Sequence, residues 1–198
     1  MKKIIRKFYL LILFVMLATP AFSNINGVLK IGDEKAKITV KVFSSLTCPH
    51  CANFHNKIFE KLKKEFIDKK KVKFEHHSFP LDLAALNAEK ILRCLKDTEK
   101  KFQLLSEIYK KQSQWAVGSD INKINESIKK IGLEFGLNDK KIDQCLKDEK
   151  LQDVILNERI KAQSKYKINS TPTIYINEKK YEDKHEFKIF KKKLKKIF

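Results

Sequence analysis

The spacing of hydrophobic residues predicts a strand-rich beginning, a helical middle and a mixed end. Residues 38–43 alternate in polarity and are β-branched, as a half-buried strand is. Weaker strand patterns cover residues 28–31 and 71–78, and residues 173–176 form a further strand followed at once by a turn. Strand patterns therefore lie on both sides of the helical middle of the chain.

Helical spacing begins directly after residue 48 and predicts a helix to about residue 66, because apolar residues recur there every three or four positions. Since this helix separates the strands at 38–43 and 71–78, those two strands are expected to be parallel. The apolar positions of the helix are Cys51, Phe54, Ile58, Leu62 and Phe66.

From residue 82 to about residue 166 the pattern is helical throughout. One helix is expected over 83–96, and Asp120 begins a later one, because its side chain can cap the free backbone N–H groups of the first turn. The order strand, helix, strand, helical segment, strand pair and last helix is that of an α/β chain.

A last helix follows the strand pair, and its apolar residues again recur at helical spacing. Asp183 and Glu186 resemble a capping box at its beginning. The many lysines of this helix are expected to form a solvated face, and they favour the C-terminal end of the helix dipole.

The first 23 residues have the features of a signal peptide. Four basic residues precede an apolar run over 8–18, which at eleven residues is short for a membrane span. Ala21-Phe22-Ser23 is a small-x-small pattern, so we expect cleavage after Ser23, with an uncleaved membrane anchor as the alternative. Export leads to an oxidising compartment, here the periplasm. The remaining 175 residues (198 − 23) suit one domain with an insertion.

The formal charge of +19 changes this picture little. It falls to +15 (19 − 4) when the four basic residues of the signal segment are removed, and only three of the 43 basic residues are arginine. Abundant Ile, Asn and Phe with five Gly indicate an AT-rich coding bias. We therefore expect no nucleic-acid partner, although a basic surface favours acidic or membrane-associated partners.

The candidate chemistry lies at Cys48-Pro49-His50-Cys51, where a strand leads into a helix. Unpaired N–H groups and the dipole at a helix N-terminus favour a thiolate at Cys48. Cys51 is about one turn further on the same face, so the two sulfurs can form a reversible disulfide. Pro49 suits the first helical turn because it has no N–H to lose. His50 can add positive charge or a hydrogen bond to the thiolate.

Two other interpretations of this motif are a structural disulfide and half of a zinc site. Zinc needs two further ligands, and His50, His55, His76 and His77 are available on paper. No second Cys-x-x-Cys exists, however, and His55 follows Cys51 by four residues on a helix. We favour redox chemistry and expect no metal. His76 and His77 lie on opposite faces of their strand and are expected to be packing or surface residues.

The second cysteine pair, Cys94 and Cys145, falls on two different predicted helices. In an oxidising compartment an even, well-separated pair usually forms a disulfide, and closing about fifty residues contributes on the order of 4 kcal/mol in the loop-entropy model. Two buried free thiols, or a regulatory pair, are the alternatives.

Together, residues 43–51 (FSSLTCPHC) and 170–173 (STPT) make the chain resemble the thioredoxin superfamily, and within it the exported DsbA-like thiol:disulfide oxidoreductases. The resemblance implies a thioredoxin fold made of 24–81 and 167–198, with an inserted helical subdomain at 82–166.

The resemblance also implies roles for individual residues. Cys48 is expected to be the nucleophile and Cys51 the resolving thiol. Pro172 is expected to follow a cis peptide bond and to face the cysteines, with Thr171 pairing with an extended substrate peptide. Family members often carry a buried acid six positions before the first cysteine. This chain has Val42 there, so a proton relay through that position is in doubt.

The function expected from motif and resemblance is a periplasmic dithiol oxidase that donates the Cys48–Cys51 disulfide to newly exported proteins with free cysteines. A membrane quinone-linked partner would reoxidise it, and no cofactor is needed. We expect a monomer. The alternatives are a disulfide reductase or isomerase on the same scaffold and, from another class, a metal-binding or folding-chaperone module.

Overall fold

A computed structural model describes residues 27–198 of the chain. The predicted signal peptide at 1–23 therefore lies outside the described residues. None of the helices within 27–198 combines the length and the apolar character needed to cross a membrane.

Five strands form one sheet, in the order β1-β3-β2-β4-β5. The strands β2 and β3 are parallel, as the sequence predicted, and every other neighbouring pair is antiparallel. The helix between β2 and β3 is the crossover connection that a parallel pair requires. The strands are β1 (Leu29–Ile31), β2 (Ile38–Ser44), β3 (Val72–Ser78), β4 (Thr173–Ile176) and β5 (Lys179–Lys180).

The helix predicted after Cys48 runs without interruption from Pro49 to Ile67. Two of its turns are π-helical, and such wider turns are frequent near functional sites. Its consecutive segments are α2 (Pro49–Phe54), η1 (His55–Phe59), α3 (Glu60–Leu62) and η2 (Lys63–Ile67).

Six helices lie between β3 and β4, which confirms the expected helical insertion. Most begin at an Asp or Asn whose side chain accepts a backbone N–H of the first turn, as Asp120 does from Asn122 and Lys123. The six are α4 (Leu83–Arg93), α5 (Thr98–Lys110), α6 (Gln112–Trp115), α7 (Ile121–Glu134), α8 (Asp139–Leu146) and α9 (Glu149–Tyr166).

The last helix, α10 (Phe187–Lys195), follows the hairpin of β4 and β5. The predicted capping box is wrong. Glu186 is the N-cap residue but makes no side-chain capping bond. Asp183 instead accepts a hydrogen bond from Lys193 Nζ at 3.2 Å, because an ammonium group competes well for its carboxylate.

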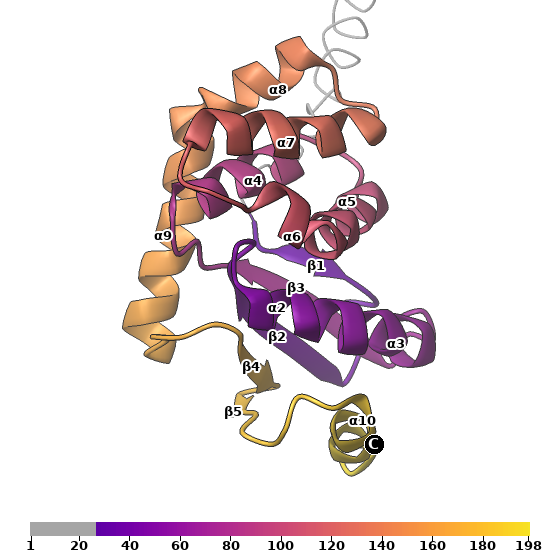
Figure 1. The fold of residues 1–198 in the computed structure, drawn as a ribbon. Coiled ribbons are helices and arrows are strands. Elements are labelled where there is room, and N and C mark those ends of the chain that lie inside the picture. Colours follow the sequence, from indigo (N-terminus) through magenta and orange to yellow (C-terminus); the bar gives the residue numbers. More distant parts are fainter. Residues whose placement is uncertain (1–26) are drawn as a thin grey trace, which may run out of the picture.

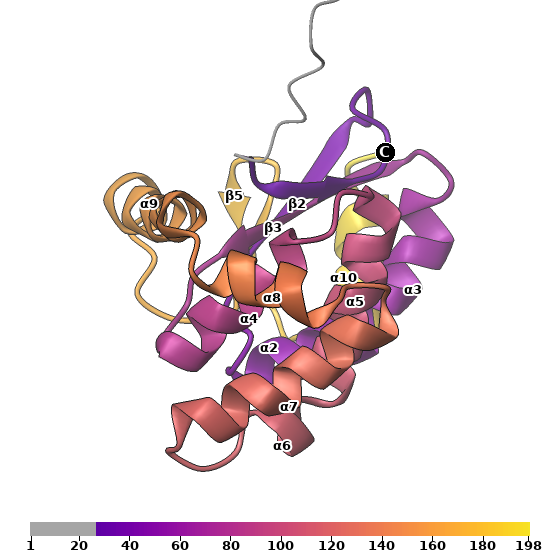
Figure 2. The ribbon, with the colours of Figure 1, turned by 90° about the horizontal axis from the view of Figure 1, so that it is seen from above.

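The two faces of the sheet are covered by different helices. Val40 and Val42 face the main core, which includes the helix after Cys48 and α10. Phe43 points to the other face, where it packs with Ala162 and Tyr166 of α9. Figure 1 shows α4–α8 gathered above the strands and α9 running past them toward β4. Figure 2 shows α9 on one side of the sheet and α3 and α10 on the other.

Candidate redox site

The two cysteines of the motif lie at the beginning of α2, directly after the central strand β2. Cys48 is the N-cap residue with an extended backbone (φ −79°, ψ 119°), and Pro49 occupies the first turn. The Cys48 carbonyl accepts hydrogen bonds from the N–H groups of Cys51 and Ala52, both at 3.1 Å. Both cysteines are free thiols. The helix N-terminus therefore holds the Cys48 sulfur beside unpaired N–H groups.

The two thiols differ sharply in acidity. A hydrogen bond from the Cys51 thiol is the largest cause that lowers the pKa of Cys48. Burial opposes it, and the Thr171 side chain and the backbone N–H groups of Cys51 and His50 assist it, so this pKa falls to about 5. Burial, followed by the nearby Cys48 sulfur, raises the pKa of Cys51 far above the usual range of a thiol. Cys48 is thus a thiolate near neutral pH while Cys51 keeps its proton.

Thr171 and Pro172 reach the site from the distant end of the chain. In its thiol form Cys48 donates a hydrogen bond from Sγ to the Thr171 carbonyl at 3.4 Å, and the Thr171–Pro172 peptide bond is cis. Both residues are half-buried. The structure therefore brings Cys48 and Cys51 together with Thr171 and Pro172, the two residues that the sequence analysis expected to contact a substrate peptide.

Pro49 and His50 are exposed at the rim of the site. His50 acts on the pKa of Cys48 through its backbone N–H. Sequence reasoning missed His185, which precedes α10. Partial loss of solvent, and then the neighbouring His50 ring, lower the pKa of His185. Its own ring lies 6.0 Å from that of Phe54. No periodicity marks this loop residue, so the sequence held no signal for it.

Two further contacts fasten the helical insertion to the cysteine loop. The Gln112 side chain in α6 donates to the carbonyls of Leu46 at 2.7 Å and Cys48 at 3.1 Å. Thr47 Oγ1 donates to Asp82 Oδ2 at 2.7 Å, and Asp82 also caps α4. The insertion therefore fixes the backbone that presents Cys48. The capping position of Asp82 could be found in the sequence, whereas the contact of Gln112 could not.

Cys94 and Cys145 are joined by a disulfide with a Cα–Cα distance of 6.1 Å. It links the end of α4 to α8 and packs with Leu86, Leu151 and Ile155. Cys48 and Cys51 belong to a different apolar cluster. The second cysteine pair is therefore spatially separate from the candidate site.

The remaining histidines are engaged in hydrogen bonds. His55 Nε2 pairs with Ser106 Oγ at 2.9 Å, and His77 Nε2 pairs with a Glu75 oxygen at 3.1 Å. His76 is buried, as expected of a packing residue. Its Nε2, however, lies 2.7 Å from Glu89 Oε1, an ion-pair partner that the helical pattern of α4 did not indicate.

The amino-acid sequence is similar to those of known proteins. The family model described as Thioredoxin matches residues 23–196. Putative protein-disulfide oxidoreductases of Rickettsia typhi and Rickettsia conorii are 30% and 32% identical, over 77% and 74% of this chain. The chain spans only about half the length of these relatives, 55% and 52% respectively.

The fold is also similar to that of a solved structure over most of the chain. Alpha-DsbA1 of Wolbachia pipientis superimposes with a TM-score of 0.79 at 28% identity, covering 86% of this chain and 90% of that one.

Proposed function

The chain belongs to the thioredoxin family, and we propose that it is a protein disulfide oxidoreductase that donates its Cys48–Cys51 disulfide to proteins with free cysteines. The asymmetry of the two thiols carries the proposal. A Cys48 pKa of about 5 stabilises the reduced form, and a stabilised reduced form makes the disulfide a stronger oxidant. The names of the rickettsial relatives and the likeness to alpha-DsbA1 support the same activity class.

The proposed reaction is a pair of thiol–disulfide exchanges. A substrate thiolate attacks Cys48 Sγ, the Cys48–Cys51 bond breaks, and Cys51 leaves with the electron pair and takes up a proton. A second substrate thiolate then attacks the substrate sulfur of the mixed disulfide and releases Cys48 as a thiolate. The substrate loses two electrons and the protein gains them. The low pKa of Cys48 makes it a good leaving group in the second exchange.

The surroundings of Cys48 suit an extended, unfolded substrate. The backbone at Thr171 lies beside the Cys48 sulfur, where a peptide strand can pair with it irrespective of side chains. Leu81 and Leu83 are 48% and 55% exposed and flank Asp82, which is hydrogen-bonded to Thr47. These apolar side chains offer contacts to unfolded segments close to the reacting sulfur.

The proposed setting is the periplasm, where newly exported proteins carry unpaired cysteines. The signal-like segment at 1–23 supports this location. A membrane quinone-linked partner would accept the electrons that the reduced pair holds. The protein itself needs no cofactor for thiol exchange, and we propose that it works as a monomer. We further propose that 24–81 and 167–198 act as the thioredoxin domain and 82–166 as the inserted helical subdomain.

Cysteine substitutions test the roles of the two sulfurs. Cys48→Ser is expected to abolish oxidation of a reduced, unfolded protein substrate. Cys51→Ala is expected to accumulate mixed disulfides between Cys48 and the substrate, visible on non-reducing gels and by mass spectrometry. The Cys94→Ala/Cys145→Ala pair is the matched control and should retain activity. Activity retained by Cys48→Ser, or bound zinc that is lost with Cys48 and Cys51, would contradict the proposal.

A further inference from the structure

The positive charge of the chain is concentrated in two short segments. Residues 61–71 and 188–198 contain twelve lysines and two acidic residues, so together they carry a formal charge of +10 (12 − 2). They account for most of the charge of +15 on residues 24–198. The first segment ends the helix that begins at Pro49, and the second contains most of α10. We refer to these two segments as the lysine surface.

The two segments lie side by side in the folded chain. α10 contacts α3, and Figure 2 shows the two helices next to each other. Lys191 Nζ lies 2.5 Å from Glu65 Oε2 and joins the segments directly. The hydrogen bond from Lys191 is the main cause that lowers the pKa of Glu65, and the charges of Lys69 and Lys195 assist it. Lysines of both segments therefore surround the same point.

Most of this charge is not compensated within the described part of the chain. The two acids of the lysine surface are already paired with lysines of the same surface. Lys193 pairs with Asp183, which lies outside it. Like charges that are crowded together repel one another, so the surface favours a partner that brings negative charge. Nine lysines make no ion pair with any of residues 27–198: Lys61, Lys64, Lys69, Lys70, Lys71, Lys188, Lys192, Lys195 and Lys196.

Two exposed apolar side chains lie among these lysines. Ile197 and Phe198 are 42% and 52% exposed. The Phe198 ring stacks on Phe66 with the ring centres 6.0 Å apart, and Lys71 Nζ lies 5.7 Å from the centre of the Phe198 ring. The apolar face of α10 itself is buried in the core, so the helix cannot insert. Lysines around a few exposed apolar side chains are typical of a site that binds a lipid surface.

A lipid surface fits these features better than an acidic protein does. The unpaired lysines are spread over the end of one helix and along another, and a plane of many headgroups can meet them without a matching shape. The exposed apolar side chains can enter the headgroup boundary at the same time. An acidic peptide would neutralise only the lysines along its own path.

The lysine surface and the redox site lie at opposite ends of one helix. Cys48 is the N-cap residue at its beginning, and residues 63–67 form its last turn. At 1.5 Å per residue, the helix from Pro49 to Ile67 spans up to roughly 28 Å. Figure 1 shows α2 leading to α3 across the sheet, with α10 and the C-terminus near the α3 end. A membrane at the lysine surface therefore leaves Cys48 open to the aqueous side.

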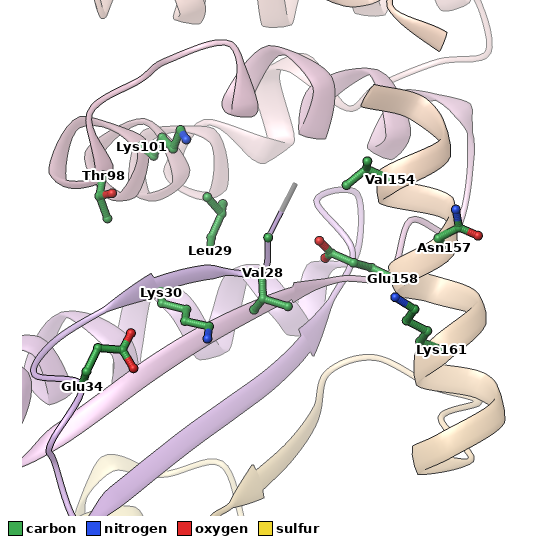
Figure 3. A pocket seen from close by; sticks show the side chains of 11 residues that line it. Val28, Leu29, Lys30, Glu34, Thr98, Lys101, Val154, Asn157, Glu158 and Lys161 are labelled. Atoms are coloured by element: carbon green, nitrogen blue, oxygen red, sulfur yellow. The ribbon is translucent and has the colours of Figure 1, made fainter. Parts of the chain in front are cut away.

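A cavity of about 700 Å³ between β1, α5 and α9 provides the contrast. Its charged lining residues add up to only +1 (3 − 2), because carboxylates lie among its lysines. Such a mixed surface produces no strong field of one sign. Its three lysines are therefore suitable for a control that removes equal charge elsewhere. Figure 3 shows Lys30, Lys101 and Lys161 around this cavity together with Glu34 and Glu158.

We propose that the lysine surface docks on anionic lipid headgroups and holds the protein at a membrane surface with Cys48 directed away from the bilayer. The unpaired lysines neutralise headgroups, while Ile197 and Phe198 enter the headgroup boundary. The binding is peripheral and reversible, and it weakens as salt screens the charges. It goes beyond the proposed disulfide exchange and does not depend on it, since docking requires no reaction at the cysteines.

Co-sedimentation with lipid vesicles tests this proposal. The protein is used in the processed form expected after signal cleavage, residues 24–198, because the apolar run at 8–18 would itself bind lipid. Vesicles of phosphatidylethanolamine and phosphatidylglycerol are the anionic probe, and vesicles of phosphatidylcholine are the neutral one. The test variant is Lys69→Gln/Lys71→Gln/Lys195→Gln. The control variant replaces each of the three cavity lysines by glutamine and therefore has the same net charge as the test variant.

The test variant should bind anionic vesicles about a hundredfold more weakly than the parent, since each lysine at an anionic surface contributes about a fivefold factor. The control variant should stay within about threefold of the parent. Phe198→Ala should weaken binding by about tenfold through lost apolar contact, whereas Ile160→Ala, at an exposed site on α9, should not. A water-soluble alkylating reagent should modify Cys48 equally fast in free and vesicle-bound protein.

Three results would overturn the inference. The parent could fail to bind anionic vesicles, which would leave an acidic protein as the partner of this surface. It could bind neutral vesicles equally well, or the two triple variants could lose affinity equally, which would make the position of the lysines irrelevant. Protection of Cys48 on the vesicles would contradict the proposed orientation. Failure of the disulfide exchange itself would leave all of these vesicle measurements unchanged.

Discussion

At the residue scale, the site depends on two cysteines three positions apart that experience opposite environments. Cys48 is at the helix N-terminus and receives hydrogen bonds that favour its thiolate, so its pKa falls to about 5. Cys51 is one turn deeper, where burial favours the neutral thiol. The same residue type is therefore an acidic thiol at one position and a protected, neutral thiol at the other.

A first prediction concerns Thr171, whose side chain helps to lower the pKa of Cys48. In Thr171→Val this pKa should rise above about 5, because valine keeps the shape but loses the hydroxyl. Ultraviolet absorbance of the thiolate, followed against pH in the reduced protein, measures the change. Thr39→Val, at the far end of β2, is the control and should titrate as the parent does. An unchanged Cys48 titration in Thr171→Val would show that the Thr171 hydroxyl has no such role.

Some site residues can be predicted from the sequence and others cannot. Cys48 and Cys51 are recognisable because a reactive dithiol needs a fixed spacing at a helix start. Glu89 is not recognisable, since a buried carboxylate on a helix has the same one-dimensional pattern as a solvated one. Its ion pair with His76 depends on how α4 packs against β3. The position of His185 could not be predicted either, because the loop that contains it has no hydrophobic periodicity.

At the element scale, the N-terminus of α2 is held between the end of β2 and the inserted helices. Gln112 of α6 spans this junction with hydrogen bonds to the carbonyls of Leu46 and Cys48. Gln112→Met should lower the free energy of unfolding by about 1–3 kcal/mol, because the buried Leu46 carbonyl loses its side-chain donor while the Cys48 carbonyl keeps only its backbone donors, Cys51 and Ala52. Urea denaturation measures the loss. Gln114→Met, an exposed position on the same helix, is the control. Equal stability of both variants would refute this role of Gln112.

The boundaries of most elements follow from local patterns, and the exceptions have tertiary causes. The strand at 38–43 follows from its alternating polarity. The helix start at Asp120 follows from the capping side chain of that residue. Glycine usually marks a helix end, but Gly132 lies within α7, where a Cβ atom would approach Ile91 and Ile142 to 3.0 and 3.2 Å, so packing against these residues favours glycine. The failed capping box at Asp183 likewise reflects an ion pair with a residue ten positions away. Contacts between elements are invisible to a local pattern.

At the scale of the whole molecule, the thioredoxin fold with an inserted helical subdomain agrees with what the sequence predicted. The order of strands and helices fixes part of it, since the helix between β2 and β3 provides the crossover that their parallel pairing requires. The packing of α4–α9 around the site could not be predicted from the sequence and is known only from the structure. The insertion both anchors the cysteine loop and carries its own disulfide.

That disulfide leads to a prediction about global stability. Cys94 and Cys145 are separated by 51 positions, so their closure restricts the unfolded chain substantially. Cys94→Ala/Cys145→Ala should lower the free energy of unfolding by about 4 kcal/mol in the loop-entropy model. The Cys48 thiolate should titrate as before, because the two pairs lie in different clusters. Unchanged stability would mean that the disulfide does not constrain the unfolded state.

The central claim is that the Cys48–Cys51 pair is a disulfide donor. The equilibrium reduction potential of this pair, measured in glutathione buffers with Cys94 and Cys145 intact, tests it most directly. The lowered pKa of Cys48 predicts a potential well above that of the glutathione couple, because the reduced form is stabilised. A potential as low as that of a thioredoxin-like reductase would contradict the claim and would assign the same scaffold to disulfide reduction.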